Sequence, residues 1–93
     1  MALKNKQATE TIAGKKFIFQ HPGLEATLDI RERTKDEKGN TSEKELYKEI
    51  LEHVVFVEED GAPKRVTVEY FEQFDSMKVF TDVMRAASKF LFR

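Results

Sequence analysis

The side chains in this 93-residue chain that could carry out acid–base chemistry are few and stand apart. His21 lies in a His-Pro-Gly segment, and His53 lies near the end of a stretch with helical apolar spacing. A general base needs a reacting partner within hydrogen-bond reach, and the sequence places no nucleophile or Asp cluster beside either imidazole. We therefore predict structural roles for both histidines, and His53 would be placed favourably for the dipole at a helix C-terminus.

Other candidate groups also lack the neighbours that their chemistry requires. Ser42, Ser76 and Ser88 have no base or oxyanion motif beside them, so we interpret them as capping or surface residues. The acidic run 58–60 lacks the ligand pattern of a calcium loop and is interpreted as a solvated turn. The glycines are scattered singly and cysteine is absent. We expect no catalytic residue, no cofactor and no metal site, and hence a protein that is not an enzyme.

Composition narrows the partners further. The chain has 17 acidic and 16 basic residues and a formal net charge of −1, which argues against nucleic acid as a partner. No apolar run approaches the roughly 20 residues of a membrane span, and the polar N-terminus lacks the apolar core of a signal peptide. These features predict one small cytoplasmic domain that does not enter a membrane.

Aromatic side chains concentrate in the last quarter of the chain. Five of the eight phenylalanines follow residue 70, and the segment closes with Phe90-Leu91-Phe92. One interpretation is that these rings form the core of a small domain. The other is that they meet a partner, since exposed apolar patches mark interaction sites. The candidate partner-binding residues are Phe74, Met77, Phe90, Leu91 and Phe92.

The elements that would position these residues form a small α+β domain over residues 15–93, after a flexible N-terminal arm over residues 1–14. Residues 16–20 are β-prone, and the His-Pro-Gly segment supplies turn chemistry. Residues 26–30 then alternate between apolar and polar side chains, which predicts that they form an N-terminal β-hairpin with residues 16–20. Residues 31–41 are charged and are expected to form a loop.

The second half begins with a capped middle helix. Ser42 to Glu45 fits a capping box, and apolar residues follow at helical spacing. Residues 54–57 predict a short extended segment before a turn. Residues 65–71 fit either a strand of a second hairpin or a short helix capped by Thr67. From residue 75, a C-terminal amphipathic helix is predicted, with one apolar face formed by Phe80, Val83, Met84, Ala87, Phe90 and Leu91.

The order of these segments resembles a known family. The FxFQHPG segment (17–23), an alternating stretch, ELYKEILEHVV (45–55), YFEQF (70–74) and AASKFL (86–91) are together similar to the small tail assembly chaperones of tailed bacteriophages. The likeness is to those of contractile-tailed prophages of Bacillus and its relatives. It covers residues 15–91 and rests on the His-Pro-Gly turn and the order of elements.

The resemblance implies a function that composition does not. Such chaperones bind the tape measure protein, a long, largely helical and apolar chain, and keep it soluble until the tail tube polymerises around it. They are absent from the mature virion. Many are made in two lengths by a ribosomal frameshift, and the longer form recruits tail tube subunits; this chain would correspond to the short form.

Two other functions stay open at this point. A structural tail-completion or connector subunit of a phage would remain in purified particles. A small regulatory DNA-binding protein is a second alternative, which the near-neutral charge disfavours. Self-association through the Phe90-Leu91-Phe92 segment in a two-fold dimer is also open.

Overall fold

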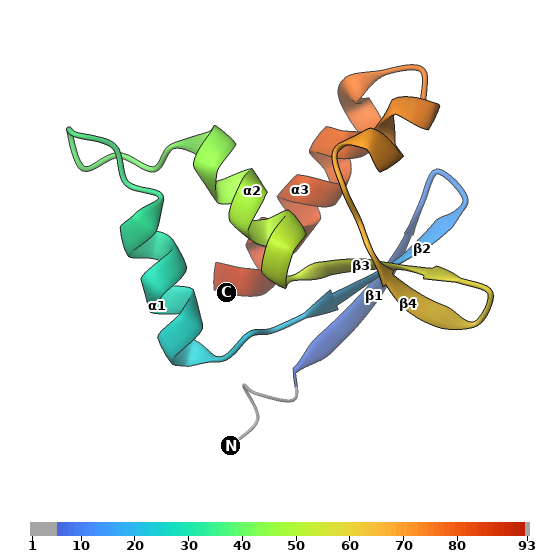
Figure 1. Ribbon diagram of the computed structural model, residues 1–93, viewed down its shortest axis with the longest axis horizontal. Coiled ribbons are helices and arrows are strands. Elements are labelled where there is room, and N and C mark those ends of the chain that lie inside the picture. The colour runs from blue at the N-terminus through green and yellow to red at the C-terminus, as the bar shows by residue number, and fades with distance from the viewer. Residues whose placement is uncertain (1–5, 93) are drawn as a thin grey trace.

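The computed structural model describes residues 6–92 (Figure 1). A 4-stranded antiparallel sheet has the strand order β1-β2-β3-β4, and helices pack beside it. The α+β single-domain class predicted from the sequence, with an N-terminal hairpin, a middle helix, an extended segment and a C-terminal helix, is confirmed. The elements in chain order are β1 (Gln7–Ile12), β2 (Lys15–Gln20), α1 (Leu24–Arg33), α2 (Glu43–His53), β3 (Val55–Glu59), β4 (Ala62–Arg65), the 3₁₀ helix η2 (Glu69–Gln73) and α3 (Met77–Phe92).

The N-terminal hairpin uses different residues from those predicted. Its first strand is β1, which comes from the segment that the sequence assigned to a flexible arm, and it pairs with β2 from Gln7↔Gln20 to Ile12↔Lys15. The connecting residues Ala13 and Gly14 both have positive φ, 55° and 77°. That conformation matches the twist of the two strands and closes a two-residue hairpin. Residues 1–5 of the predicted arm lie outside the described part of the chain.

The prediction of a strand over residues 26–30 was wrong, because this stretch belongs to helix α1. Its Leu, Glu, Ala and Arg content favours a helix. The buried side chains are Thr27, Ile30 and Thr34, whose spacing follows the helical period. Leu28, which the alternation placed on a buried face, is half exposed. The His-Pro-Gly segment therefore joins β2 to a helix, and Gly23 caps that helix with a positive φ of 105°.

The local predictions for the middle of the chain are confirmed except for one half of the capping box. Ser42 Oγ accepts a hydrogen bond from Glu45 N at 3.4 Å and caps α2, which is one half of the predicted capping box. The other half differs, because Ser42 N donates to Thr34 O at 2.6 Å, at the end of α1, instead of to the Glu45 side chain. The extended segment is β3, and Asp60 and Gly61 form the tight turn that leads into β4.

Residues 65–71 combine parts of both predicted alternatives. The second hairpin exists, but its second strand ends at Arg65. The following residues enter η2, where Thr67 Oγ1 accepts a hydrogen bond from Tyr70 N at 3.3 Å. A short helix thus follows the strand as predicted, but its N-cap residue is Val68 and not Thr67, which lies one residue earlier, and it ends at Gln73, before Phe74.

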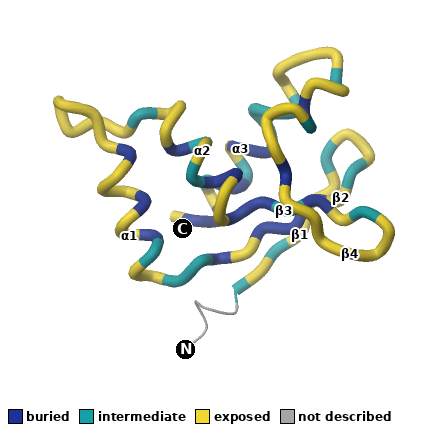
Figure 2. The backbone as a smooth tube through the Cα atoms, viewed as in Figure 1, coloured by how far each residue is buried: buried dark blue, intermediate teal, exposed yellow. Residues whose placement is uncertain are grey.

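The core lies where α2 and α3 cover one face of the sheet (Figure 2). The sheet contributes Phe17 and Phe19 from β2, which pair across the strands with Val57 and Val55. Buried side chains of α3 pack into the same cluster, namely Val83, Met84, Ala87, Phe90 and Leu91. The predicted apolar face of the C-terminal helix is confirmed by this burial, with Phe80 half-buried at its margin.

Candidate functional site

Two adjoining hollows lie where the first turn of α3 meets η2 and α2. Their volumes are about 380 and 330 Å³. Both are lined by Val68, Met77 and Phe80, so the two hollows adjoin along these residues and together make one surface. We call it the apolar groove, and its apolar lining consists of Tyr47, Leu51, Val68, Phe71, Phe74, Met77 and Phe80.

The most exposed side chains of the groove are Met77 and Val68. Met77 is 72% exposed and Val68 is 56% exposed, both high values for large apolar residues. Val66 is buried in the core, after which the chain turns into η2 and leaves Val68 outside. Met77 is the first residue of α3 and precedes the buried face of that helix. The exposure of both residues therefore follows from where η2 and α3 begin.

The floor of the groove is anchored to the core by aromatic contacts. The rings of Phe80 and Tyr47 meet edge-on at 5.7 Å between centroids. Phe80 and Phe71 also meet edge-on, at 5.1 Å, and Phe71 lies parallel to the buried Phe17 ring at 6.1 Å. Edge-to-face and offset parallel pairs are favourable arrangements of aromatic rings. The groove is thus a fixed feature of the packing of α2, η2 and α3.

Charged side chains surround this apolar floor. Glu72 and Asp75 lie on the side formed by η2 and the start of α3. Lys44 and Lys48 lie on the α2 side together with Glu43. An apolar floor between charged margins is the geometry that accepts an amphipathic helix, whose apolar face enters the groove while its flanks stay solvated. Methionine suits such a surface because its side chain adapts to irregular partners.

The five partner-binding candidates from the sequence do not form one site. Phe74 and Met77 line the apolar groove. Phe90 and Leu91 lie in the core, where the Phe90 and Phe19 rings are 6.0 Å apart. Phe92 is 41% exposed and borders a separate hollow of about 370 Å³ with Arg31, Thr34, Thr41 and Leu46. Phe90 and Leu91 are thus core residues, whereas Met77 and Phe92, at the two ends of α3, are exposed.

Sequence reasoning missed Val68, Tyr47, Leu51, Phe71 and Phe80 as groove residues. Tyr47 and Phe80 were assigned to the apolar faces of their own helices, which is correct locally. The groove arises only because the apolar faces of α2 and α3 pack against each other. The sequence pattern within either helix does not predict that contact. One feature of the sequence weakly indicated Val68. It is an apolar residue within residues 65–71, the stretch that fitted either a strand or a short helix.

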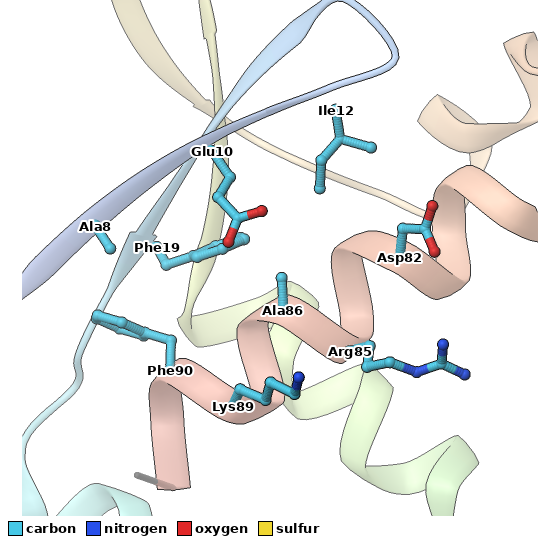
Figure 3. Close-up of a pocket in the computed structure, with 9 residues that line it drawn as sticks. All are labelled: Ala8, Glu10, Ile12, Phe19, Asp82, Arg85, Ala86, Lys89 and Phe90. Carbon is cyan, nitrogen blue, oxygen red and sulfur yellow. The ribbon is translucent and has the colours of Figure 1, made fainter.

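A third hollow, of about 470 Å³, lies between β1 and α3 and differs in chemistry (Figure 3). Phe19, Phe90 and small apolar side chains lie at its base. Its remaining lining is charged, from Glu10 on β1 and from Asp82, Arg85 and Lys89 on α3. This mixed lining provides no continuous apolar surface for a partner helix.

The histidines occupy structural positions. His21 is buried, its Nδ1 accepts a hydrogen bond from Gly23 N at 3.0 Å, and its ring packs against Phe90 at 5.9 Å. His53 Nε2 lies 3.5 Å from Glu49 Oε1 at the end of α2. The structural roles predicted for both residues agree with these contacts. Within residues 6–92, no group of three or more His, Cys, Asp or Glu side chains is close enough to hold a metal ion.

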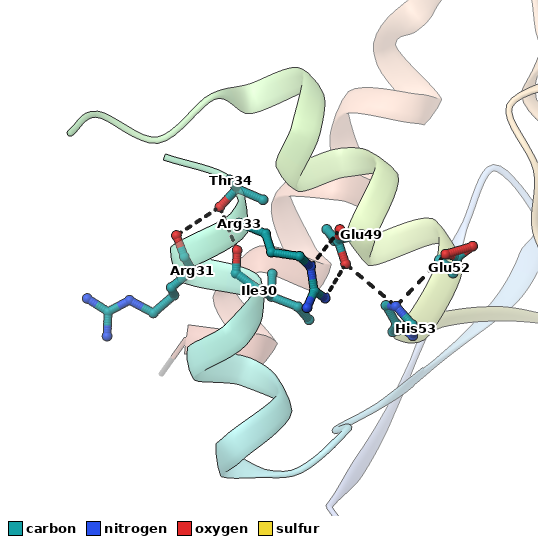
Figure 4. A network of polar contacts seen from close by, with 7 residues as sticks. All are labelled: Ile30, Arg31, Arg33, Thr34, Glu49, Glu52 and His53. Carbon is teal, nitrogen blue, oxygen red and sulfur yellow. Dashed lines mark hydrogen bonds and ion pairs between the residues drawn. The ribbon is translucent and has the colours of Figure 1, made fainter. Parts of the chain in front are cut away.

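A polar network joins α1 to α2 (Figure 4). Arg33 donates from Nε and Nη2 to the two carboxylate oxygens of Glu49, at 3.2 and 2.8 Å. These hydrogen bonds lower the pKa of Glu49 below its ordinary value. The network holds α1 beside α2 and leaves the apolar groove unobstructed.

Comparison with known protein families, with curated proteins and with solved structures found no match for this chain. None of the helices within residues 6–92 combines the length and the apolar character that crossing a bilayer requires.

Proposed function

We propose that this protein is a non-enzymatic tail assembly chaperone of a tailed bacteriophage or prophage. In this role it binds the tape measure protein and keeps it soluble before the tail tube polymerises. The sequence resemblance supplies the client, and the apolar groove supplies a surface suited to it. The observation that carries the proposal is the apolar surface where the exposed Val68 and Met77 lie beside the half-buried Phe74 and Phe80, between charged margins.

The groove has the properties that a chaperone for a helical chain needs. Its floor is apolar, so it covers the apolar face that makes an isolated client helix aggregate. Burying a side chain such as Met77 contributes about 1.5–3 kcal/mol, so one groove binds a helix with modest affinity. Modest affinity per site lets many copies cover a long client and lets the assembling tube displace them.

The proposal extends to location and to further partners. We expect the protein in the cytoplasm of the bacterial host cell and not in the mature virion. A longer frameshifted form, if the phage makes one, would bring tail tube subunits to the client. Neither nucleic acid nor a membrane takes part in this mechanism.

Co-expression with the tape measure protein of the same phage or prophage tests the proposal. Affinity capture of this protein should recover soluble client, with many copies of the chaperone per client chain by light scattering. Met77→Asp should abolish or strongly reduce the soluble client, because a carboxylate in the groove would be desolvated against an apolar face. Lys64→Asp is the control, since Lys64 is exposed on β4 and does not line the groove.

Either of two results would contradict the proposal. One is a client that stays insoluble with the wild-type protein present. The other is recovery of the protein as a component of purified phage particles, which would make a structural tail subunit the better account.

A further inference from the structure

We propose that the apolar groove of one copy binds helix α1 of a second copy, so that the isolated protein assembles head to tail. Within residues 6–92, helix α1 carries two of the large apolar side chains that are exposed away from the groove. Leu24 is 58% exposed and Leu28 is 50% exposed. Arg31 follows one turn later, so the three residues lie at i, i+4 and i+7 on one side of the helix. This spacing is the one that a helix uses to fill a groove.

The groove cannot take α1 of its own chain. Helix α1 lies at one end of the molecule, and η2 with the start of α3 lies at the other (Figure 1). The bidentate contact of Arg33 with Glu49 holds α1 against α2. Burial of Thr27, Ile30 and Thr34 fixes the inner face of α1, which leaves Leu24 and Leu28 on its flank. Only another copy can bring this flank to the groove.

The charges of the two surfaces are complementary. Arg31 lies in line with the exposed leucines, and the groove margin carries Glu72 and Asp75. None of these three side chains has an ion-pair partner within residues 6–92. The opposite margins match as well, since α1 exposes Glu25 and α2 exposes Lys44. Such a pattern fixes the direction in which one copy docks on the next.

The contact joins two different surfaces, so it is heterologous. Each copy keeps a free groove at one end and a free α1 at the other, and association therefore continues beyond two copies. A single helix flank buries less surface than a standard stable interface, so the contact is weak and exchanges readily. Under the proposed function, α1 of a neighbour would cover the groove until a client helix displaces it. That role rests on the proposed function, whereas the self-contact does not.

Sedimentation velocity of the purified protein, with no client present, tests the contact. The wild type should show a sedimentation coefficient that rises with concentration and passes the value for two copies. Met77→Asp places a charge in the groove, and Leu28→Asp places a charge on the exposed flank of α1. Either change should prevent the contact, so each variant alone should stay monomeric. An equimolar mixture of the two should form a one-to-one pair and nothing larger, because one intact groove meets one intact α1.

Charge reversal provides a second test that does not alter the apolar surfaces. Arg31→Glu should weaken association at least tenfold through repulsion from Glu72 and Asp75. Combining Arg31→Glu with Glu72→Lys and Asp75→Lys should restore it. All three positions are exposed, so the fold should tolerate these changes.

Three results would overturn the inference. A wild type that stays monomeric up to about 1 mM excludes the contact, because a site with a dissociation constant of that size would be more than one-third occupied there. Growth that stops at two copies indicates a two-fold interface instead. A mixture of the Asp variants that stays monomeric shows that their surfaces do not meet. None of these results bears on whether the tape measure protein is bound, which the co-expression test decides separately.

Discussion

The phenol ring of Tyr47 on α2 lies edge-on against the ring of Phe80 on α3, with the centroids 5.7 Å apart. Phe80 contacts Phe71 of η2 in the same manner, at 5.1 Å. Helix α2 therefore meets the two consecutive segments η2 and α3 at one aromatic junction. The exposed side chains of Val68 and Met77 lie above this junction and line both parts of the apolar groove.

The two phenylalanines near the end of α3 should differ sharply in their contribution to stability. Phe90 is buried against Phe19 and His21, so Phe90→Ala should lower the free energy of unfolding by about 3–5 kcal/mol. Phe92 is 41% exposed, and Phe92→Ala should cost about 1 kcal/mol or less. Urea denaturation of both variants checks this. Equal losses would contradict the burial of Phe90.

Removing the hydroxyl of Tyr70 should not destabilise the protein and should even stabilise it. The Tyr70 hydroxyl oxygen is buried and has no hydrogen-bond partner within residues 6–92. Burial also raises the pKa of Tyr70, with a further contribution from Glu59. Because an unsatisfied buried hydroxyl is costly, Tyr70→Phe should leave the protein as stable as the wild type or stabilise it by about 1 kcal/mol.

Thermal unfolding followed by circular dichroism measures the effect of Tyr70→Phe. A loss of more than about 1 kcal/mol would reveal a hydrogen bond to that hydroxyl and refute the expectation. Tyr47→Phe is a useful comparison. Tyr47 also lies in the aromatic junction, but its hydroxyl, unlike that of Tyr70, is not both buried and unsatisfied.

The contribution of the Ser42 cap of α2 to protein stability should be measurable with a single substitution. Ser42→Ala removes the hydroxyl that accepts from Glu45 N, and the expected loss is about 1 kcal/mol of stability. Ser88→Ala is the matched control, because Ser88 lies inside α3, where alanine is a better helix former. Chemical denaturation should show a loss for the first variant and none for the second. The reverse order would mean that the cap contributes nothing.

The contact between Arg33 and Glu49 should make stability depend on pH in the acid range. Because the pKa of Glu49 is lowered in the folded state, its contribution is present above the unfolded-state pKa and is lost as pH falls through the folded-state pKa. Glu49→Gln should thus be less stable than the wild type at neutral pH, and the difference should shrink on acidification. The wild type and variant are compared by denaturation across this pH range.

A double-mutant cycle identifies the partner of Glu49. Arg33→Met should reproduce the neutral-pH loss, and adding it to Glu49→Gln should cost little more. Additive losses would show that Glu49 acts mainly through another neighbour, such as His53, whose Nε2 lies 3.5 Å from the same carboxylate.

The features predicted correctly from the sequence are those that a few neighbouring residues decide. The cap by Ser42, the β-branched segment of β3 and the apolar periodicity of α3 each depend on contacts within a turn or two of the chain. The burial along α3 was predicted for the same reason.

The errors lie where local patterns are ambiguous or silent. Residues 26–30 alternate like a strand, but they also fit a helix that buries Thr27 and Ile30, and the packing of α1 on α2 decides the outcome. Strand β1 has a mostly exposed, polar sequence, and it forms because β2 offers it a partner edge. The apolar groove depends on the meeting of Tyr47 with Phe80, which no single segment encodes.

The most direct measurement is crosslinking from the groove to the client. The chain has no cysteine, so Met77→Cys creates a unique thiol for a photoreactive label at the centre of the groove. Lys64→Cys, on exposed β4, is the control. In the complex with the tape measure protein, irradiation should join the client to the label at position 77 and not to the label at position 64. Equal crosslinking from both positions, or none from position 77, would contradict the groove as the client-binding surface.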